Sequence, residues 1–116
     1  MDFPNLPYFI DEDVQLSEPL AIMKYIALRY GSETLLGGNL EEKASVEMFT
    51  HTLTELNRMA SMPCYFDNVD QQELSDNLLL NMASLASVME ARRSKYLVGS
   101  HVTLTDFMLF ELCERI

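Results

Sequence analysis

The residues best suited to chemistry lie near the start of the chain, in the stretch from Asp2 to Ile10, Asp-Phe-Pro-Asn-Leu-Pro-Tyr-Phe-Ile. Proline has no N–H and pushes the residue before it out of the helical region, so Leu6 is expected to be extended. Its backbone N–H and C=O would then be free to pair with an extended molecule, and an X-Pro bond is where a cis peptide is affordable. We therefore interpret Leu6-Pro7 as a backbone clamp for a small-molecule ligand.

The cysteines and the paired arginines give weaker indications of a functional site. Cys64 and Cys113 are far apart, no CxxC occurs, and no Cys/His cluster has the spacing of a metal site. We expect two reduced thiols and no metal. The pair Arg92-Arg93 could bind an anion, but we prefer to interpret it as positive charge at the C-terminal end of a helix, where it is favourable.

Composition limits the possible partners. The chain has 116 residues, 48% of them hydrophobic, and a net charge of −10. This length suits one domain or slightly more. The acidity argues against nucleic acid and anionic membranes as partners. We find neither an apolar run near the roughly 18 residues of a membrane span nor the pattern of a signal peptide, so we expect a cytoplasmic protein.

The first 30 residues are expected to form a β-hairpin and one helix. Strands over 8–10 and 14–16 flank a polar turn, Asp11-Glu12-Asp13. A helix from Pro19 to Tyr30 follows, capped by Ser17 or Glu18 and ended by Gly31. Its expected buried stripe is Ala21, Ile22, Tyr25 and Ile26. Residues 31–39 hold three of the four glycines and are predicted to be a linker.

Residues 40–116 are expected to form a second, all-helical domain of three helices. The first runs from Leu40 to Met62 and is stopped by Pro63. The second follows a capping box, Asp70-x-x-Glu73, and the third follows another, Thr103-x-x-Asp106, with Val102 and Phe107 as a hydrophobic staple. The predicted core positions are Val46, Phe49, Leu53, Leu56 and Ala60, then Leu74, Leu78, Met82, Leu85 and Met89, then Phe107, Phe110 and Leu112.

The hairpin with its helix buries too little surface to stand alone and exposes a sheet edge. A missing part or a partner chain, whether a second copy or another protein, is expected to cover it.

Five ordered segments, taken together, resemble the mu-class glutathione transferases over nearly the whole chain. They are residues 2–8, 16–27, 40–43, 62–65 and 102–107. The resemblance implies a fold that is mostly α with a short β-hairpin. Residues 1–30 would form part of a thioredoxin-like glutathione domain, and residues 40–116 would form the all-helical domain that binds the electrophile. It also implies that both domains are incomplete.

The resemblance assigns roles to single residues. Pro7 matches the family's cis-proline, Leu6 would pair its backbone with the cysteinyl part of glutathione, and Asn5 would add a side-chain contact. Tyr65 matches a tyrosine that lines the electrophile pocket. Two further residues match residues that act across the family's dimer. Glu55 matches an acidic residue that reaches the glutathione amino group of the other subunit, and Phe3 matches an aromatic key residue that docks in a pocket of the other subunit. Each has an ordinary alternative: Asn5 as a turn residue, Tyr65 as a helix end, Glu55 as a solvated charge, and Phe3 as a hydrophobic lid.

The chain departs from the family pattern in two places. The segment carrying the tyrosine that lowers the pKa of the glutathione thiol has no counterpart, and without it the thiol stays protonated. The family's Gln-Ser pair is replaced by Glu18-Pro19, which removes a hydroxyl and an N–H and adds a negative charge where a ligand carboxylate sits.

The resemblance implies conjugation of glutathione to small apolar electrophiles, with this chain weakly active or inactive as given. The alternatives are a non-catalytic interaction or scaffold subunit and a ligand-holding protein.

Overall fold

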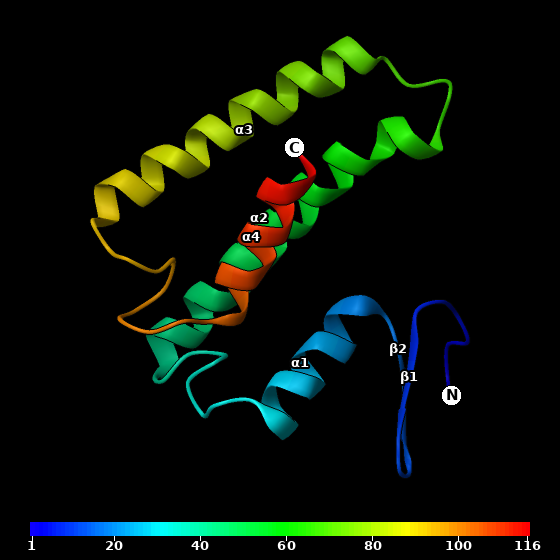
Figure 1. The fold of residues 1–116 in the computed structure, drawn as a ribbon, viewed down its shortest axis with the longest axis vertical. Coiled ribbons are helices and arrows are strands. Elements are labelled where there is room, and N and C mark those ends of the chain that lie inside the picture. The colour runs from blue at the N-terminus through cyan, green and yellow to red at the C-terminus, as the bar shows by residue number, and fades with distance from the viewer.

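The computed structural model describes all residues from 1 to 116 and confirms a mostly helical fold with a short hairpin (Figure 1). The hairpin and α1 lie on one side of the long helix α2, α4 lies against α2, and α3 runs along the opposite edge. The elements in chain order are β1 (Tyr8–Asp11), β2 (Val14–Ser17), α1 (Pro19–Tyr30), α2 (Leu40–Tyr65), α3 (Gln71–Arg92) and α4 (Leu104–Arg115).

The hairpin is an isolated two-stranded antiparallel sheet, so each strand has one open edge. Phe9 faces Leu16 across the ladder, and Asp11 faces Val14. Because side chains alternate along a strand, these four residues share the face toward α1. The ring of Phe9 lies 5.8 Å from that of Tyr25 on α1, which fixes the helix against this face.

Helix α2 extends one turn beyond its predicted end. Pro63 was expected to stop it after Met62, but the helix continues to Tyr65. Proline removes its own N–H and restricts the residue before it, whereas the residues after it can remain helical. The N–H of Phe66 still donates to the carbonyl of Met62 at 3.1 Å, which closes the final turn.

The predicted N-cap residues of α3 and α4, Asp70 and Thr103, are confirmed, whereas the half of the predicted α3 box that requires the Glu73 side chain is not formed. Asp70 accepts from the N–H groups of Gln72 and Glu73, both at 3.0 Å. At α4 both halves of the Thr103–Asp106 box are present. These contacts satisfy backbone donors that have no partner inside the helix.

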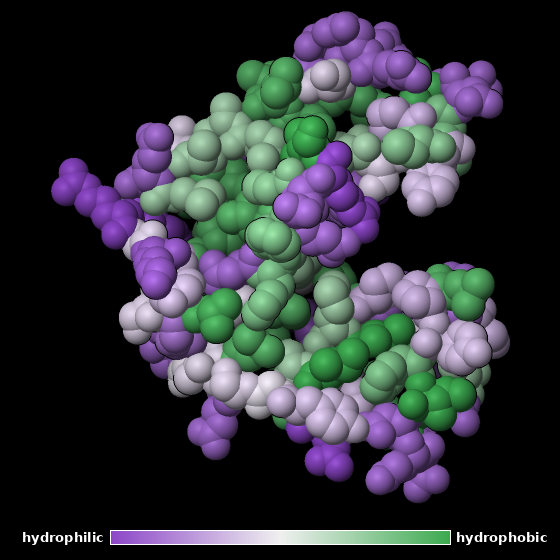
Figure 2. Space-filling view, viewed as in Figure 1, coloured by the Kyte–Doolittle hydropathy of each residue, from purple (hydrophilic) through white to green (hydrophobic).

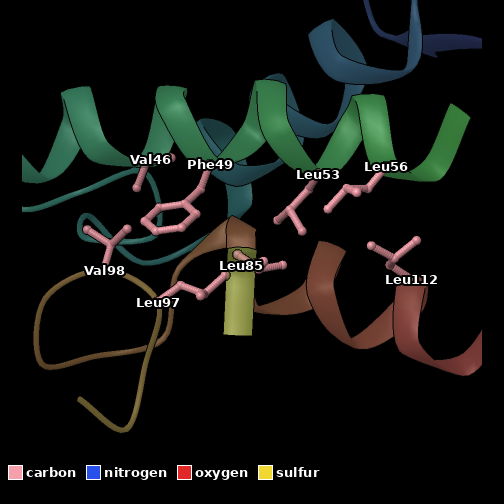
Figure 3. Close-up of a cluster of buried hydrophobic side chains, with 8 residues drawn as sticks. All are labelled: Val46, Phe49, Leu53, Leu56, Leu85, Leu97, Val98 and Leu112. Atoms are coloured by element: carbon pink, nitrogen blue, oxygen red, sulfur yellow. The ribbon is translucent and has the colours of Figure 1, made fainter. Parts of the chain in front are cut away.

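The core lies between α2, α3, α4 and the segment that joins the last two helices (Figure 3). It confirms most of the periodicity predicted on α2. Partly buried residues around it include Ala60, Leu78 and Met82. The eight buried side chains are Val46, Phe49, Leu53, Leu56, Leu85, Leu97, Val98 and Leu112.

Three predicted core faces were partly wrong. On α3, Met89 is 40% exposed, because the core cluster meets this helix only at Leu78, Met82 and Leu85.

On α4, Phe107 and Phe110 are 57% and 67% exposed, because this helix turns Leu104, Met108 and Leu112 inward instead. Val102 is also 40% exposed, so the predicted staple buries little apolar surface.

On α1 only Ala27 is buried, and Ala21 and Ile26 are exposed. The helix packs on a sheet of only two strands, which is too narrow to cover the predicted stripe.

The molecule is more open than a folded monomer of its size. It exposes 8244 Å², and 14 of its 116 residues are buried. A folded monomer of this mass exposes about 6,450 Å². The radius of gyration is 15.8 Å, against about 13 Å for a compact domain of this length. Figure 2 shows a deep notch in the outline between the part that carries the C-terminal end of α2 and the part that carries the hairpin. None of the helices is long and apolar enough to cross a membrane.

Candidate functional site

The predicted clamp lies on the surface immediately before β1. The Leu6-Pro7 peptide bond is cis, and the side chain of Leu6 is 78% exposed. The N–H of Leu6 donates to the side-chain oxygen of Asn5 at 2.9 Å. The side chain of Asn5 therefore accepts the hydrogen bond that the Leu6 N–H was expected to donate to the ligand. A ligand that pairs with this N–H would have to displace the Asn5 side chain.

The first three residues fold back over the hairpin. Ser17, at the end of β2, donates its hydroxyl to the carbonyl of Phe3, and the terminal ammonium of Met1 donates to Gln15 at 3.1 Å. Gln15 and Ser17 share the face of the sheet opposite α1. Phe3 remains 75% exposed, so its ring is available for contact with another surface.

Glu18 and Pro19 form the start of α1. Glu18 is the N-cap, with φ 72° and ψ 114°, and its side chain makes no capping hydrogen bond. A positive φ is unusual for a residue other than glycine. Ser17, the other predicted cap, bonds Phe3 instead. Both Glu18 and Pro19 line a cavity of about 290 Å³ between α1, α2 and α4.

The two predicted site residues on α2 lie apart from the clamp. The carboxylate of Glu55 accepts two hydrogen bonds from Arg58, at 2.6 and 2.9 Å, and this partner lowers the pKa of Glu55. Tyr65 is 80% exposed and lines a different cavity, of about 230 Å³, with Cys64 and Arg115. The structure thus brings neither residue into contact with Asn5, Leu6 or Pro7.

A cluster of three side chains that was not expected from the sequence ties the hairpin turn to α1. Asp11 accepts hydrogen bonds from Tyr25 at 2.9 Å and from Tyr30 at 2.6 Å. These hydroxyls lower the pKa of Asp11, and the same bonds raise the pKa of both tyrosines. The sequence feature that could have indicated this cluster is the pair of tyrosines, Tyr25 and Tyr30, on the helix that follows an acidic turn.

The basic pair at the end of α3 has structural partners. The guanidinium of Arg92 lies 4.8 Å from the ring centre of Phe49 and donates to the carbonyl of Leu97 at 3.0 Å. Arg93 is the C-cap in the left-handed conformation. These contacts support the interpretation as a helix end, because Arg92 is committed to the protein itself.

Metal chemistry has no evident donor set here. The structure places no three His, Cys, Asp or Glu side chains where they could share a metal ion.

Known proteins provide an independent comparison. No protein-family sequence model matches the chain. Individual relatives do match, and the chain spans about half the length of the curated relatives it matches. It is 34% identical to the class-mu 26 kDa glutathione S-transferase of Schistosoma japonicum, over 96% of this chain and 50% of that protein. It is 35% identical to the class-mu isozyme of Schistosoma mansoni, over 96% of this chain and 55% of that protein.

A vertebrate protein shows the same relationship. Glutathione S-transferase Mu 4 of Rattus norvegicus is 29% identical over 98% of this chain and 51% of that protein. With the helical fold and the cis Leu6-Pro7 segment before a hairpin, these matches agree on one assignment. The chain belongs to the glutathione S-transferase family and is related to its mu class.

Proposed function

We propose that residues 1–116 contribute part of a glutathione-binding site, in a protein whose reaction is transfer of glutathione to small apolar electrophiles. The observation that carries the proposal is the exposed Leu6 beside the open edge of β1, in a chain of this family. An extended peptide can add to such an edge through main-chain hydrogen bonds. The bound glutathione would be surrounded by Asn5, Pro7, Glu18 and Pro19. Glu55 and Phe3 would act across a dimer. Tyr65 would line the electrophile pocket.

We also propose that these residues on their own are a weak or inactive catalyst. The family's thiol-activating tyrosine has no counterpart in them, so a bound thiol would stay mostly protonated at neutral pH. Glu18 would repel the γ-glutamyl carboxylate, and Pro19 offers no N–H to it. The cytoplasm is the compartment we propose, which agrees with two exposed and unpaired cysteines.

The test separates binding from catalysis. Calorimetry with glutathione and with S-hexylglutathione is expected to show weak binding that Leu6→Pro abolishes, because proline removes the N–H at the clamp. Assays with a chlorinated nitrobenzene are expected to show little or no conjugation. Equal binding by Leu6→Pro would refute the clamp. A conjugation rate typical of the family would refute the proposed inactivity but leave the clamp standing.

A second function, as a non-catalytic interaction subunit, is favoured by the open surface. The chain exposes 8244 Å², about 1,800 Å² more than a compact monomer of its mass. That excess is about twice the roughly 800 Å² that each partner contributes to a standard protein interface. A stable complex with a protein outside this family, formed without glutathione, would support this function.

A further inference from the structure

The linker of residues 31–39 is fastened to the helical body, α2 to α4, where the start of α2 meets the segment that joins α3 to α4 (Figure 1). The N–H of Leu104 donates to the carbonyl of Leu35 at 2.9 Å. The Nε2 atom of His101 lies 3.2 Å from the carbonyl oxygen of Thr34. Because the linker leads from the hairpin and α1 into the helical body, these contacts help to set how the two parts are placed.

The carboxylate of Glu42, in the first turn of α2, lies at the centre of this contact. It accepts a hydrogen bond from the N–H of Gly38 at 2.7 Å, and its Oε2 atom lies 3.7 Å from Nε2 of His101. A Cβ at Gly99 would lie 2.6 Å from Oε1, closer than a Cβ can come, so the glycine lets the segment reach the carboxylate. We refer to Glu42, His101 and the carbonyl of Thr34 as the linker joint.

The ring of His101 faces two acceptors at once. The carbonyl of Thr34 accepts a hydrogen bond from Nε2–H whether the ring is neutral or charged, whereas the carboxylate of Glu42 attracts only the charged ring. Both side chains are largely covered, at 30% and 22% exposed, which limits the screening of this attraction by water. The charge of one histidine therefore decides whether the joint has two attractive contacts or one.

Other charged groups lie on the same segments, but none of them forms an ion pair within 4.0 Å. They are Glu33 on the linker, Glu41 and Lys43 on α2, Arg93 and Lys95 between α3 and α4, and Asp106 on α4. No carboxylate other than that of Glu42 lies within 4.0 Å of the ring nitrogens of His101. Carboxylates ordinarily stay ionised between pH 5.5 and 8, so histidine is the group whose charge changes there.

We propose that the linker joint is a pH-sensitive connection, in which the charge on His101 sets how firmly the linker is held against the helical body. When the ring is charged, it is attracted to Glu42 and bonded to Thr34. When the ring is neutral, the attraction to Glu42 is lost and the linker moves more freely. The hairpin and α1 follow the linker, so the joint also governs how firmly the candidate clamp is placed relative to the helical body. The proposal is independent of whether glutathione binds.

The test measures hydrogen exchange of two backbone amides at the joint, those of Gly38 and Leu104. After correction for the intrinsic pH dependence of exchange, both are expected to be protected at least about threefold more at pH 5.5 than at pH 8.0, a size that suits a partly exposed pair. The amide of Phe66, which closes the far end of α2, is the reference and should be protected equally at both pH values. Sodium chloride at 1 M should reduce the difference at the joint, because salt screens the pair.

Variants identify the group responsible. His101→Gln and Glu42→Gln are each expected to remove the pH dependence at Gly38 and Leu104, and the double variant should differ little from either single one. His51→Gln is the matched control, because His51 is the other histidine of the chain, is exposed on α2 and has no ion pair. Far-UV circular dichroism checks that each variant is folded.

Three results would overturn the proposal. The first is equal protection at both pH values in the unaltered protein, which needs no variant. The second is a pH dependence that persists in His101→Gln, and the third is one that disappears in His51→Gln.

Discussion

The carboxylate of Asp11 accepts a hydrogen bond of 2.6 Å from the hydroxyl of Tyr30, and this bond joins the hairpin turn to the last turn of α1. Tyr25 donates to the same carboxylate oxygen at 2.9 Å. A two-stranded sheet is marginal by itself, so its attachment to α1 decides whether the hairpin keeps its place. The candidate clamp at Leu6-Pro7 leads directly into β1, and the cluster therefore positions the proposed glutathione site.

The attachment of the hairpin should depend on pH. The folded pKa of Asp11 is lowered from 3.8, so its contribution to the free energy of unfolding is present above that value and is lost as the pH falls through the folded pKa. The folded pKa values of Tyr25 and Tyr30 are raised from 10.0, so their contribution is present below pH 10 and is lost as the pH rises. We expect NMR to show loosening of the hairpin first at both extremes.

The double change Tyr25→Phe, Tyr30→Phe removes both donors and should return the pKa of Asp11 toward 3.8. Carboxyl NMR titration measures this directly. Tyr8→Phe, on the opposite face of the hairpin, is the matched control and should leave the titration of Asp11 unchanged. A double variant that titrates like the original protein would show that the two tyrosines do not hold Asp11.

Helix positions were predictable where local rules are strong. The capping residues Asp70 and Thr103 located the starts of α3 and α4, because their side-chain oxygens satisfy backbone donors whatever the tertiary structure. The predicted end of α2 was wrong because Pro63 disturbs the turn before it, through its missing N–H and its ring, but leaves the residues after it free to stay helical. Burial on α1 and at Phe107 and Phe110 was less predictable, since it depends on which neighbouring elements cover each face.

The core of α2 leads to a prediction of stability. Leu53 is 1% exposed and belongs to the cluster shared with α3 and α4. Leu53→Ala is expected to lower the free energy of unfolding by about 2–5 kcal/mol, since it removes buried methyl groups and leaves a cavity. Leu80, which is 68% exposed, is the matched control. Leu80→Ala should change the stability by less than about 0.5 kcal/mol. Denaturant titration measures both, and equal losses would contradict the assigned core.

The start of α4 depends on Asp106 for more than its own cap. Its carboxylate accepts from the N–H of Thr103 at 2.8 Å and from the N–H of buried Leu97 at 2.9 Å. Asp106→Ala leaves both donors without a partner, at a cost of about 1–3 kcal/mol for each one that stays buried. Asp70→Ala at the exposed cap of α3 should cost only about 1 kcal/mol. Thermal unfolding that ranks Asp70→Ala as the more damaging change would refute this role.

Only part of the candidate site could be predicted from the sequence. The cis Leu6-Pro7 bond and the exposure of Leu6 agree with expectation. The hydrogen bond from Leu6 to Asn5 was not foreseen, because the rotamer of a short amide side chain is not encoded by spacing. The cavity between α1, α2 and α4 was not expected either, since it depends on how helices far apart in the sequence meet.

The pair Glu18-Pro19 leads to the last prediction, which concerns glutathione. Both residues stand at the N-terminus of α1, where free N–H groups and the helix dipole favour an anion. A carboxylate placed beside another costs on the order of 1–3 kcal/mol, and proline removes one donor. The double change Glu18→Gln, Pro19→Ser should therefore strengthen glutathione binding about tenfold in calorimetry.

Glu41→Gln, an equal change of charge at the start of α2, is the control and should leave affinity unchanged. If Glu41→Gln raised the affinity as much as the double change, net charge rather than the geometry at α1 would be limiting. No gain in either variant would mean that the glutathione carboxylate does not meet this end of α1.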